Sequence, residues 1–318
     1  MKKKILVTGA AGFIGFHLAQ ALQARGDHVI GLDNFNNYYD PQLKRDRAKI
    51  LQQKGIEIIE ADLCDPSLLA SLLPQHEITN LVHLAAQAGV RYSIQNPQAY
   101  VDSNVAAFLH VLEACRQNPH IPLTFASSSS VYGTNTKVPF SESDMSDAPA
   151  SFYGATKKSN ELMAFSYHHM YGIKATGLRF FTVYGPWGRP DMAYYSFSEE
   201  ISHGRPINVY NHGNMQRDFT YIDDIVQGIV SAIDLEAPWE IFNLGNHTPV
   251  KLMDMIELLE RHLGKAAQKN FIAMQTGDVL TTYADIAHSQ EKLRFSPKTT
   301  IDQGLKMFVD WYANYHRK

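Results

Sequence analysis

The first 185 residues alternate short apolar runs with longer helical stretches, and this alternation limits the fold more than any other feature. Candidate strands lie at residues 4–8, 28–33, 56–62, 80–85, 123–127 and 175–181. Helical patterns fill the intervals at residues 13–24, 41–53, 66–73, 97–116 and 153–171. Several candidate strands are apolar on both faces, which is typical of strands covered by helices on each side. The alternation therefore predicts right-handed βαβ units and an α/β fold built on a doubly wound parallel sheet.

After Gly185 the regular alternation ends. Short candidate strands at residues 207–210, 240–244 and 271–274 mix with helical patterns at residues 193–203, 223–234, 252–263 and 301–315. This mixture predicts a second, smaller α/β region in the C-terminal part of the chain. We expect residues 1–185 to form the first domain and residues 186–318 to form a smaller region that is interwoven with it.

Length and composition indicate a globular protein. Of the 318 residues, 45% are hydrophobic and 19% are charged, as in ordinary globular proteins. The formal net charge of −3 gives no bulk attraction to nucleic acid or to an anionic membrane, so we expect neither as a partner. Any anionic ligand is expected in a local binding site.

The chain carries no convincing targeting signal. The lysines at residues 2–4 and the apolar run after them resemble a secretion signal, but glycines interrupt that run. No apolar run is long enough to span a bilayer. Cys64 and Cys115 lie in apolar patterns, and neither cysteines nor histidines have metal-ligand spacing. We therefore expect buried thiols, no metal and a cytoplasmic protein.

Residues 9–15 read GAAGFIG, directly after the first candidate strand and at the start of the first helical pattern. Gly9 permits a tight turn, Gly12 allows the backbone to approach a pyrophosphate, and Gly15 allows close packing of helix on strand. The helix N-terminus, with Phe13 and Ile14, offers N–H donors and the positive end of the helix dipole to the phosphates. The motif predicts a dinucleotide site of the Rossmann type.

Two acidic positions strengthen this prediction. Asp33 ends the second candidate strand, where its carboxylate can accept both ribose hydroxyls of NAD and repel the extra phosphate of NADP. Asp62, followed by Leu63, ends the third candidate strand, where the adenine ring is expected. A glycine-rich turn that binds nothing is the alternative, but it leaves Asp33 unexplained. The predicted cofactor is NAD.

Residues 153–157 read YGATK, which places Tyr153 and Lys157 one helical turn apart on the same face. The ammonium is expected to lower the pKa of the Tyr153 phenol, which then takes a proton from a sugar hydroxyl while hydride leaves the same carbon. Residues 127–133 read SSSSVYG at the end of a candidate strand, the edge where active sites of open α/β sheets lie. We assign Ser128 to share the proton, although the pattern leaves its neighbours open. An exposed Tyr/Lys pair and a serine-rich turn are the alternatives, and neither explains their coincidence.

Together these motifs resemble those of extended short-chain dehydrogenases/reductases of the nucleotide-sugar epimerase family. The similarity covers essentially the whole chain and includes RFFTVYGP at residues 179–186 and RDFTYIDD at residues 217–224. Longer strings are similar to those of the UDP-glucuronate 4-epimerases. These are DNFNNYYD at residues 33–40, AAQAGVRYS at residues 85–93 and PWGRPDMA at residues 186–193.

The resemblance implies NAD-dependent 4-epimerisation of a UDP-hexuronic acid, from UDP-glucuronate to UDP-galacturonate. Hydride leaves C4 for NAD while Tyr153 takes the hydroxyl proton, the transient 4-keto sugar turns over, and hydride returns to the other face. NAD then stays bound between turnovers. Because the 4-keto uronate is a β-keto acid that loses CO₂ readily, the site must also hold its carboxylate in an unreactive orientation.

Related activities are the alternatives. Sugar 4,6-dehydratases carry an Asp-Glu pair where this chain has Ser129 and Ser130, and decarboxylases carry a Glu at the second of these positions, so both are disfavoured. UDP-galactose-type epimerases usually carry an Asn where Thr182 stands. A reductase that releases its cofactor at each turnover stays open. An NAD-sensing regulator is disfavoured, because it has no use for a Ser/Tyr/Lys set.

The resemblance also implies the residues of both binding sites. For NAD they are the glycine turn and acidic positions above together with Asn34, Ala85, Ala86, Asn104, Tyr153, Lys157, Phe180 and Val183. For the UDP-sugar they are Arg91, Ser128, Ser129, Ser130, Thr182, Arg189, Arg217, Gln275 and Asp278. Arg217 is expected at the diphosphate, where arginine binds well, Asp278 at the ribose, and Thr182 and Arg189 at the uronate carboxylate. A surface ion pair for Arg217 and a turn for Asp278 are the alternatives.

Two further expectations concern helices. The family commonly dimerises through helices equivalent to residues 97–116 and 153–171, which implies a homodimer. The basic run of Lys44, Arg45 and Arg47 is more typical of a solvated helix face than of a phosphate site.

Overall fold

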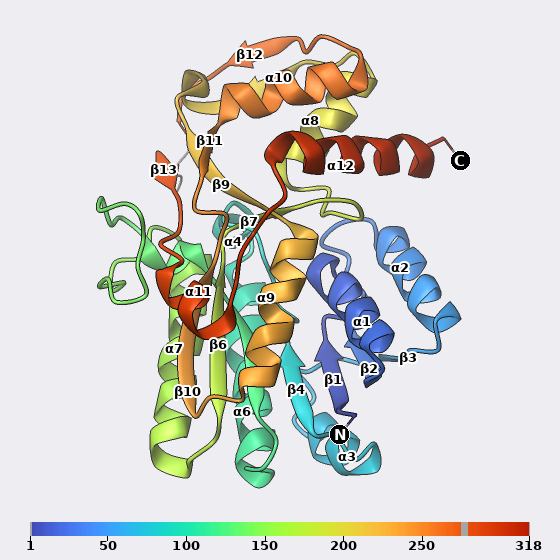
Figure 1. Ribbon diagram of the computed structural model, residues 1–318, viewed down its shortest axis with the longest axis vertical. Coiled ribbons are helices and arrows are strands. Elements are labelled where there is room, and N and C mark those ends of the chain that lie inside the picture. Colours follow the sequence, from blue (N-terminus) through green and yellow to red (C-terminus); the bar gives the residue numbers. More distant parts are fainter. Residues whose placement is uncertain (1, 275–278, 318) are drawn as a thin grey trace.

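The computed structural model describes residues 2–274 and 279–317. Its central sheet has seven parallel strands in the order β10-β6-β5-β4-β1-β2-β3 (Figure 1). The strands are β1 Lys4–Thr8, β2 His28–Asp33, β3 Glu57–Glu60, β4 Asn80–His83, β5 Leu123–Ser128, β6 Ala175–Phe180 and β10 Trp239–Leu244. The doubly wound parallel sheet predicted from the sequence is confirmed.

Helices cover both faces of this sheet (Figure 1). On one face α1 (Phe13–Arg25) packs against α2 (Pro41–Gln53) and α9 (Ile222–Leu235), and on the other α6 (Ala107–Gln117) packs against α3 (Leu68–Gln75) and α7 (Phe152–Tyr171). Ile5 and Val7 belong to one buried cluster and Leu6 to the other, because successive side chains of a strand point to opposite faces. The strands therefore read as apolar on both faces.

A smaller region lies above the carboxyl edge of the sheet (Figure 1). Its main strand, β9 (Gln216–Tyr221), pairs with β7 (Thr182–Tyr184), β11 (Pro249–Lys251) and β13 (Thr281–Thr282). A separate two-stranded sheet joins β8 (Ile207–Val209) to β12 (Lys269–Phe271). The helices of this region are α8 (Ala193–Ser202), α10 (Leu252–Leu263) and α12 (Ile301–Tyr315).

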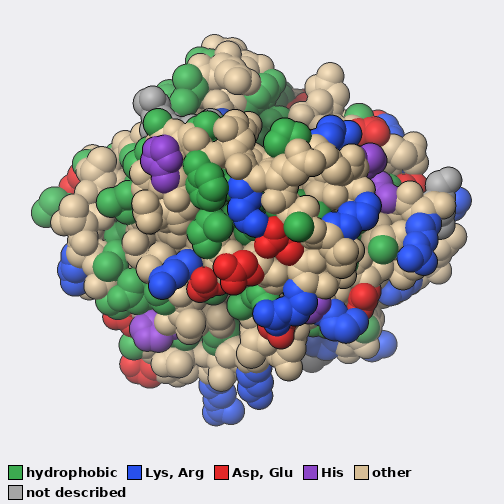
Figure 2. Space-filling view, turned by 90° about the horizontal axis from the view of Figure 1, so that it is seen from above, with side chains coloured by type: hydrophobic (Ala, Val, Ile, Leu, Met, Phe, Trp, Pro, Cys, Tyr) green, Lys and Arg blue, Asp and Glu red, His purple; other side chains and the backbone are tan. Residues whose placement is uncertain are grey.

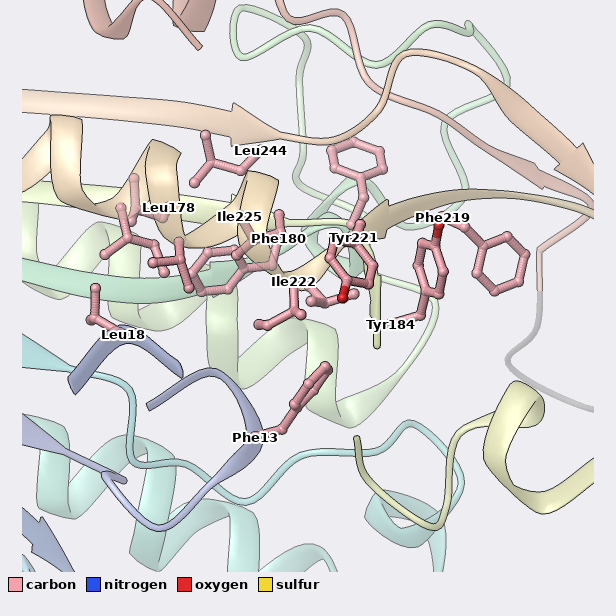
Figure 3. Packing of buried hydrophobic residues seen from close by; sticks show 14 of the residues in the cluster. Phe13, Leu18, Leu178, Phe180, Tyr184, Phe219, Tyr221, Ile222, Ile225 and Leu244 are labelled. Carbon is pink, nitrogen blue, oxygen red and sulfur yellow. The ribbon is translucent and has the colours of Figure 1, made fainter. Parts of the chain in front are cut away.

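The C-terminal part of the chain returns to the central sheet. After β9, α9 packs on α1, β10 pairs with β6, and α11 (Ala287–Leu293) packs against α9 and β10. One buried apolar cluster joins Leu178 and Phe180 of β6 to Tyr184, Phe219 and Tyr221 of the upper sheet (Figure 3). The two regions therefore share a core.

Two expected elements differ in the structure. The helix expected at residues 97–116 is divided into α5 (Pro97–Tyr100), a π-helical turn (Val101–Ala106) and α6, and a short α4 (Tyr92–Gln95) precedes them. Pro97 follows Asn96, whose side chain accepts from Ala99 N and so caps a new helix start. The strand expected at residues 271–274 lies earlier, at β12, where pairing with β8 determines its position.

Other surface features bear on the expected partners. Basic and acidic side chains lie side by side on the face shown in Figure 2. No helix in the described part of the chain is long and apolar enough to cross a membrane. Within those same residues, no group of three or more His, Cys, Asp or Glu side chains can hold a metal ion. Cys115 is buried as expected, but Cys64 is exposed, because it follows β3 in a surface turn where its amide donates to Asp62.

Candidate active site

A cleft lies at the carboxyl ends of β1, β2, β4, β5 and β6. The residues of its wall that the sequence predicted are Gly9, Gly12, Phe13, Ile14, Gly15, Asp33, Asn34, Asp62, Leu63, Ala85, Ala86, Ser128, Tyr153, Lys157, Phe180, Val183 and Arg189. The fold thus brings residues that are far apart in the chain to one edge of the sheet, where open α/β sheets bind their ligands.

The glycine turn has the geometry that a pyrophosphate requires. Gly9 has a left-handed φ of 70°, and its amide donates to Leu32 O at 2.7 Å. A Cβ on Gly15 would lie 2.1 Å from Gly9 O, so only glycine fits between helix and turn. Gly12 is the N-cap of α1 and supplies no side chain to the first helical amides, which suits them to bind an anion.

Asp33 is buried at the end of β2. Its carboxylate accepts from Ala11 N at 3.0 Å and from Phe35 N at 2.9 Å. Beside it, the Asn34 amide donates to Asp62 Oδ2 at 3.0 Å. These bonds fix two carboxylates at the sheet edge beside the glycine turn, so the residues present fit a dinucleotide with an unphosphorylated ribose.

Asn104 lies outside the cleft wall that the described residues form. It is 1% exposed, and its amide donates to Gln87 O at 2.9 Å while its oxygen accepts from Gln87 N at 2.8 Å. The π-helical turn directs this side chain inward, since such turns change the facing of residues within a helix. Asn104 therefore supports the loop after β4, in which Ala85 and Ala86 line the cleft.

The serines after β5 have separate partners. Ser127 donates to Glu161 Oε1 at 2.6 Å in the protein interior. Ser128 lies at the cleft and hydrogen-bonds the Tyr153 phenol, and its oxygen also accepts from Ser130 N at 3.1 Å. Of these serines, Ser128 is the one that the fold places beside the phenol.

The pKa of Tyr153 differs from the sequence-based expectation. Burial raises it above the ordinary value, and the hydrogen bond from Ser128 and the charge of Arg189 only partly offset this effect. The charge of Lys157 is not among the causes of this shift in the pKa of Tyr153, and its ammonium donates to Ala126 O at 2.9 Å. Burial also lowers the pKa of Lys157 itself to about 8.

Arg189 lies in the cleft wall beside an acidic partner. Its Nε donates to Asp191 Oδ1 at 3.0 Å and its Nη2 to Asp191 Oδ2 at 2.5 Å. The charges of both side chains reach Tyr153, since Arg189 lowers the pKa of the phenol and Asp191 raises it. The site therefore contains an arginine whose charge acts on the Tyr153 phenol.

Several residues predicted to contact the substrate lie outside the cleft wall formed by the described residues; they are Arg91, Ser129, Ser130, Thr182 and Arg217. Arg91 packs over the Tyr210 ring at 4.5 Å. Arg217 donates from Nη1 to Gln216 O at 2.9 Å and to Leu280 O at 3.2 Å. Gln275 and Asp278 fall outside the described residues.

Three of the predicted substrate residues that lie outside the cleft wall belong to short elements next to it. Ser129 and Ser130 begin a 3₁₀ turn (Ser129–Tyr132) directly after Ser128. Thr182 begins β7 and pairs with Phe219 of β9, while its neighbour Val183 lines the cleft. Each of these three residues lies within two positions of a residue that lines the cleft.

The basic run on α2 was interpreted wrongly at two of its three positions. Lys44 is 6% exposed and lines the cleft, and its ammonium donates to Asn36 O at 2.9 Å. Arg47 is 0% exposed and donates to Ala11 O and Trp187 O. Only Arg45, paired with Glu60, is solvated. Sequence spacing could not show that α2 turns these two side chains toward the cofactor edge.

Two tyrosines of the cleft wall, Tyr38 and Tyr39, were missed as site residues. They follow β2 in the string DNFNNYYD, which provided the resemblance but no chemical role. The Tyr38 hydroxyl donates to Asp191 Oδ2 at 3.1 Å. The signal that could have located them is the polar and aromatic run between a strand end and the next helix.

The fold and the Ser/Tyr/Lys cleft define an enzyme of the short-chain dehydrogenase/reductase class. The chain belongs to the NAD dependent epimerase/dehydratase family, whose model matches residues 5–245.

Known relatives agree with this assignment. The chain is 52% identical over 330 residues to UDP-glucuronate 4-epimerase 4 of Arabidopsis thaliana, covering 98% of this chain and 76% of that protein. It is similar to the crystal structure of UDP-glucuronic acid 4-epimerase from Bacillus cereus in complex with UDP-glucuronic acid and NAD, with 36% identity, a TM-score of 0.92 and coverage of 98% and 99%. UDP-glucose 4-epimerase of Thermotoga maritima with UDP-glucose is also similar, at 29% identity, a TM-score of 0.88 and the same coverage.

Proposed function

We propose that this chain is an NAD-dependent epimerase that interconverts UDP-glucuronate and UDP-galacturonate by inverting C4. The observation that carries the proposal is the presence of Tyr153, Ser128 and Arg189 in the cleft that also contains the glycine turn and Asp33. The A. thaliana and B. cereus proteins described above, named for this activity, support it. The same cleft supports assignment of the catalytic residues and, apart from Asn104, of the cofactor-binding residues predicted from the sequence.

Each side chain has one role in the proposed reaction. When bound, NAD supplies an acceptor and later a donor for the hydride at C4. Tyr153 takes the proton of the C4 hydroxyl and returns it, and Ser128, which hydrogen-bonds the phenol, shares that proton. Lys157, one helical turn after Tyr153, binds the cofactor. The reaction has no net redox change, so one cofactor molecule serves many turnovers.

The sugar-binding residues are part of the same proposal. Arg189 binds the uronate carboxylate beside Tyr153, and Thr182, Ser129 and Ser130 donate hydroxyls to the sugar from the adjoining elements. Arg91 is a further donor for the uronate carboxylate, and Arg217, Gln275 and Asp278 bind the UDP end.

The division of the chain follows from these roles. Residues 1–185 bind NAD, carry out the chemistry and contribute some contacts to the sugar, and residues 186–318 form the rest of the nucleotide-sugar site. The return of α9 and β10 to the central sheet connects the two functions through one core.

Epimerisation of UDP-glucose is the second candidate, because the T. maritima UDP-glucose 4-epimerase has the same fold. The cation of Arg189 in the cleft favours the uronate, because a carboxylate forms charge-assisted hydrogen bonds with a guanidinium and a neutral sugar does not. We expect UDP-glucuronate to be turned over at least about tenfold faster than UDP-glucose, because a site built for a polar group rejects analogues that lack it. Initial rates on both sugars measure this ratio. Equal rates would rule out the uronate assignment.

Replacement of Asp33 is expected to change cofactor choice. Asp33→Ala removes the charge that repels a 2′-phosphate, so the preference for NAD over NADP should fall by about tenfold or more. Titration of cofactor-depleted protein with each dinucleotide measures the preference. Asp33→Asn is a second test of the charge, because it removes the charge but keeps the size of the side chain and one oxygen, which can accept from one of the two amides that Asp33 binds. Tighter binding of NADP by the native protein contradicts the assignment of NAD.

The homodimer and the cytoplasmic location complete the proposal. Exposed apolar side chains on α6 and α7 support an interface between two copies of the chain; they are Leu109, Leu162, Phe165 and Met170. The unpaired Cys64 and Cys115 support a reducing compartment.

Charges on α7 are expected to dissociate the dimer. Leu162 and Phe165 are 59% and 49% exposed, and glutamates at both positions would bring like charges into an apolar interface. Light scattering of the native protein should give a dimer mass, and the double variant Leu162→Glu/Phe165→Glu a monomer mass. Met307→Glu, at an exposed position of α12, should leave the dimer intact. A monomeric native protein would contradict the prediction.

A further inference from the structure

The arginine of the cleft is already paired. Arg189 and Asp191 form two parallel hydrogen bonds, at 3.0 and 2.5 Å, through the Nε and Nη2 groups of the guanidinium. The two side chains are 24% and 25% exposed. Two-point pairs of this kind are strong and hold the guanidinium in a defined plane. These bonds use both oxygens of the Asp191 carboxylate.

Asp191 has a second donor that does not depend on Arg189. The Tyr38 hydroxyl donates to Asp191 Oδ2 at 3.1 Å. Burial and the neighbouring carboxylate raise the pKa of Tyr38, so the hydroxyl keeps its proton. Gly89, with φ of 101°, makes room for this tyrosine, because a Cβ there would lie 2.5 Å from the hydroxyl oxygen. Asp191 therefore retains a hydrogen bond when Arg189 turns away.

The backbone that carries the pair is fixed to the cofactor-binding half. His17 Nε2 bonds Pro186 O at 2.9 Å. Arg47 donates from Nη2 to Trp187 O at 2.6 Å and to Gly188 O at 3.1 Å, and its Nη1 holds Ala11 O of the glycine turn. Because the segment before Arg189 is anchored in this way, a change of partner by the guanidinium has to occur in side chains.

A uronate carboxylate adds a third charge to this site. With Asp191 present, binding changes the formal charge of the cluster from zero to −1. Without Asp191 the formal charge changes from +1 to zero. Such a site would bind the carboxylate more strongly, but Arg189 would be unpaired in a partly buried cleft whenever the carboxylate leaves. Such an unpaired charge raises the free energy of the folded protein. Epimerisation requires departure of the carboxylate, because the 4-keto sugar must present both faces to the same hydride position.

We propose that Asp191 is the resting partner of Arg189 and takes the guanidinium back each time the uronate carboxylate leaves it during the turn of the 4-keto sugar. This inference rests on the proposed function. Asp191 is a positioning residue, since it acts through Arg189 and not on the reacting atoms. Tyr38 stabilises Asp191 during the interval in which Arg189 binds the substrate.

Asp191→Asn tests the exchange, because the amide keeps the size of the side chain and removes its charge. We expect KM for UDP-glucuronate to fall by about tenfold, which corresponds to about 1.4 kcal/mol of tighter binding. We expect kcat to fall by about tenfold as well, because the carboxylate is held too strongly for the sugar to turn. The fraction of enzyme-bound NADH in the steady state should rise, since the 4-keto stage lasts longer. The inhibition constant of UDP, which has no carboxylate, should be unchanged.

Tyr38→Phe is expected to change KM in the opposite direction to Asp191→Asn. Without the hydroxyl, Asp191 has less support when it is alone, so it holds Arg189 more strongly and KM for UDP-glucuronate rises by about threefold. Asp310→Asn is the matched control, because Asp310 pairs with Lys306 on the exposed face of α12 at 2.7 Å. Its kinetic constants should equal those of the native enzyme.

The outcomes are distinguishable. Native turnover of UDP-glucuronate with an unchanged or increased KM in Asp191→Asn overturns the exchange alone. If the inhibition constant of UDP falls by the same factor as KM for UDP-glucuronate, the exchange is also overturned, because the effect would not depend on the carboxylate. Absence of turnover in the native protein overturns the proposed function, and the exchange with it.

Discussion

Tyr153→Phe is expected to lower turnover of UDP-glucuronate by about a hundredfold or more, the usual contribution of a general acid–base group. The variant keeps the ring that packs edge-on against Tyr100 at 6.0 Å, so folding and retained NAD should be unchanged. Only the hydroxyl, which Ser128 hydrogen-bonds at the cleft, is lost. Initial rates measure the effect, and cofactor released on denaturation measures NAD retention.

Two further variants separate chemistry from packing. Ser128→Ala should reduce turnover less than Tyr153→Phe, because it removes a shared hydrogen bond and leaves the phenol. Tyr315→Phe, which loses a hydroxyl bonded to Asp46 at 2.6 Å on α2, should have native turnover. Near-native turnover in Tyr153→Phe would refute the proposed role of the phenol.

Glu161→Ala is expected to reduce the free energy of unfolding by about 3–5 kcal/mol, the cost of leaving one member of a buried ion pair alone. Arg179 and Glu161 are each 4% exposed and are joined by two bonds of 2.8 Å. Ser127 adds a third bond to the same carboxylate, and the guanidinium lies 4.8 Å from the Tyr132 ring centre. Removal of the carboxylate leaves the cation without its partner between β6 and α7. Urea denaturation measures the loss.

Matched variants test whether burial of the ion pair causes the loss in the free energy of unfolding. Glu200→Ala removes one of the two acidic partners of Arg205 at the surface and should cost less than about 1 kcal/mol. The double variant Glu161→Leu/Arg179→Met should be more stable than Glu161→Ala, because apolar side chains need no charge partner. A loss below about 1 kcal/mol in Glu161→Ala would contradict this account of the pair.

Much of the fold could be predicted because its local signals agree. Both faces of each central strand are buried, so the apolar runs were visible without tertiary information, and α2 and α12 were predicted with their observed bounds. The division of the helix at residues 97–116 could not be predicted, because the residues of the π-helical turn make long-range contacts such as the bond between Asn104 and Gln87. The place of β10 beside β6 depends likewise on long-range pairing.

The site was predictable where chemistry requires particular residues at fixed spacing. The glycine turn, Asp33 and the Tyr153/Lys157 pair all lie at the cleft. Side-chain partners were not predictable, since spacing does not show that Lys157 donates to a carbonyl or that burial raises the pKa of Tyr153. The same limit applies to Asp191, which is an ordinary loop residue in the sequence.

The most direct test of the proposed epimerase is incubation of the purified protein with UDP-glucuronate and no added cofactor. NMR of the sugar ring follows the configuration at C4. The account predicts conversion to UDP-galacturonate over many turnovers per enzyme, supported by NAD that the protein already carries. An unchanged C4 configuration, or product limited to the amount of enzyme, would contradict it.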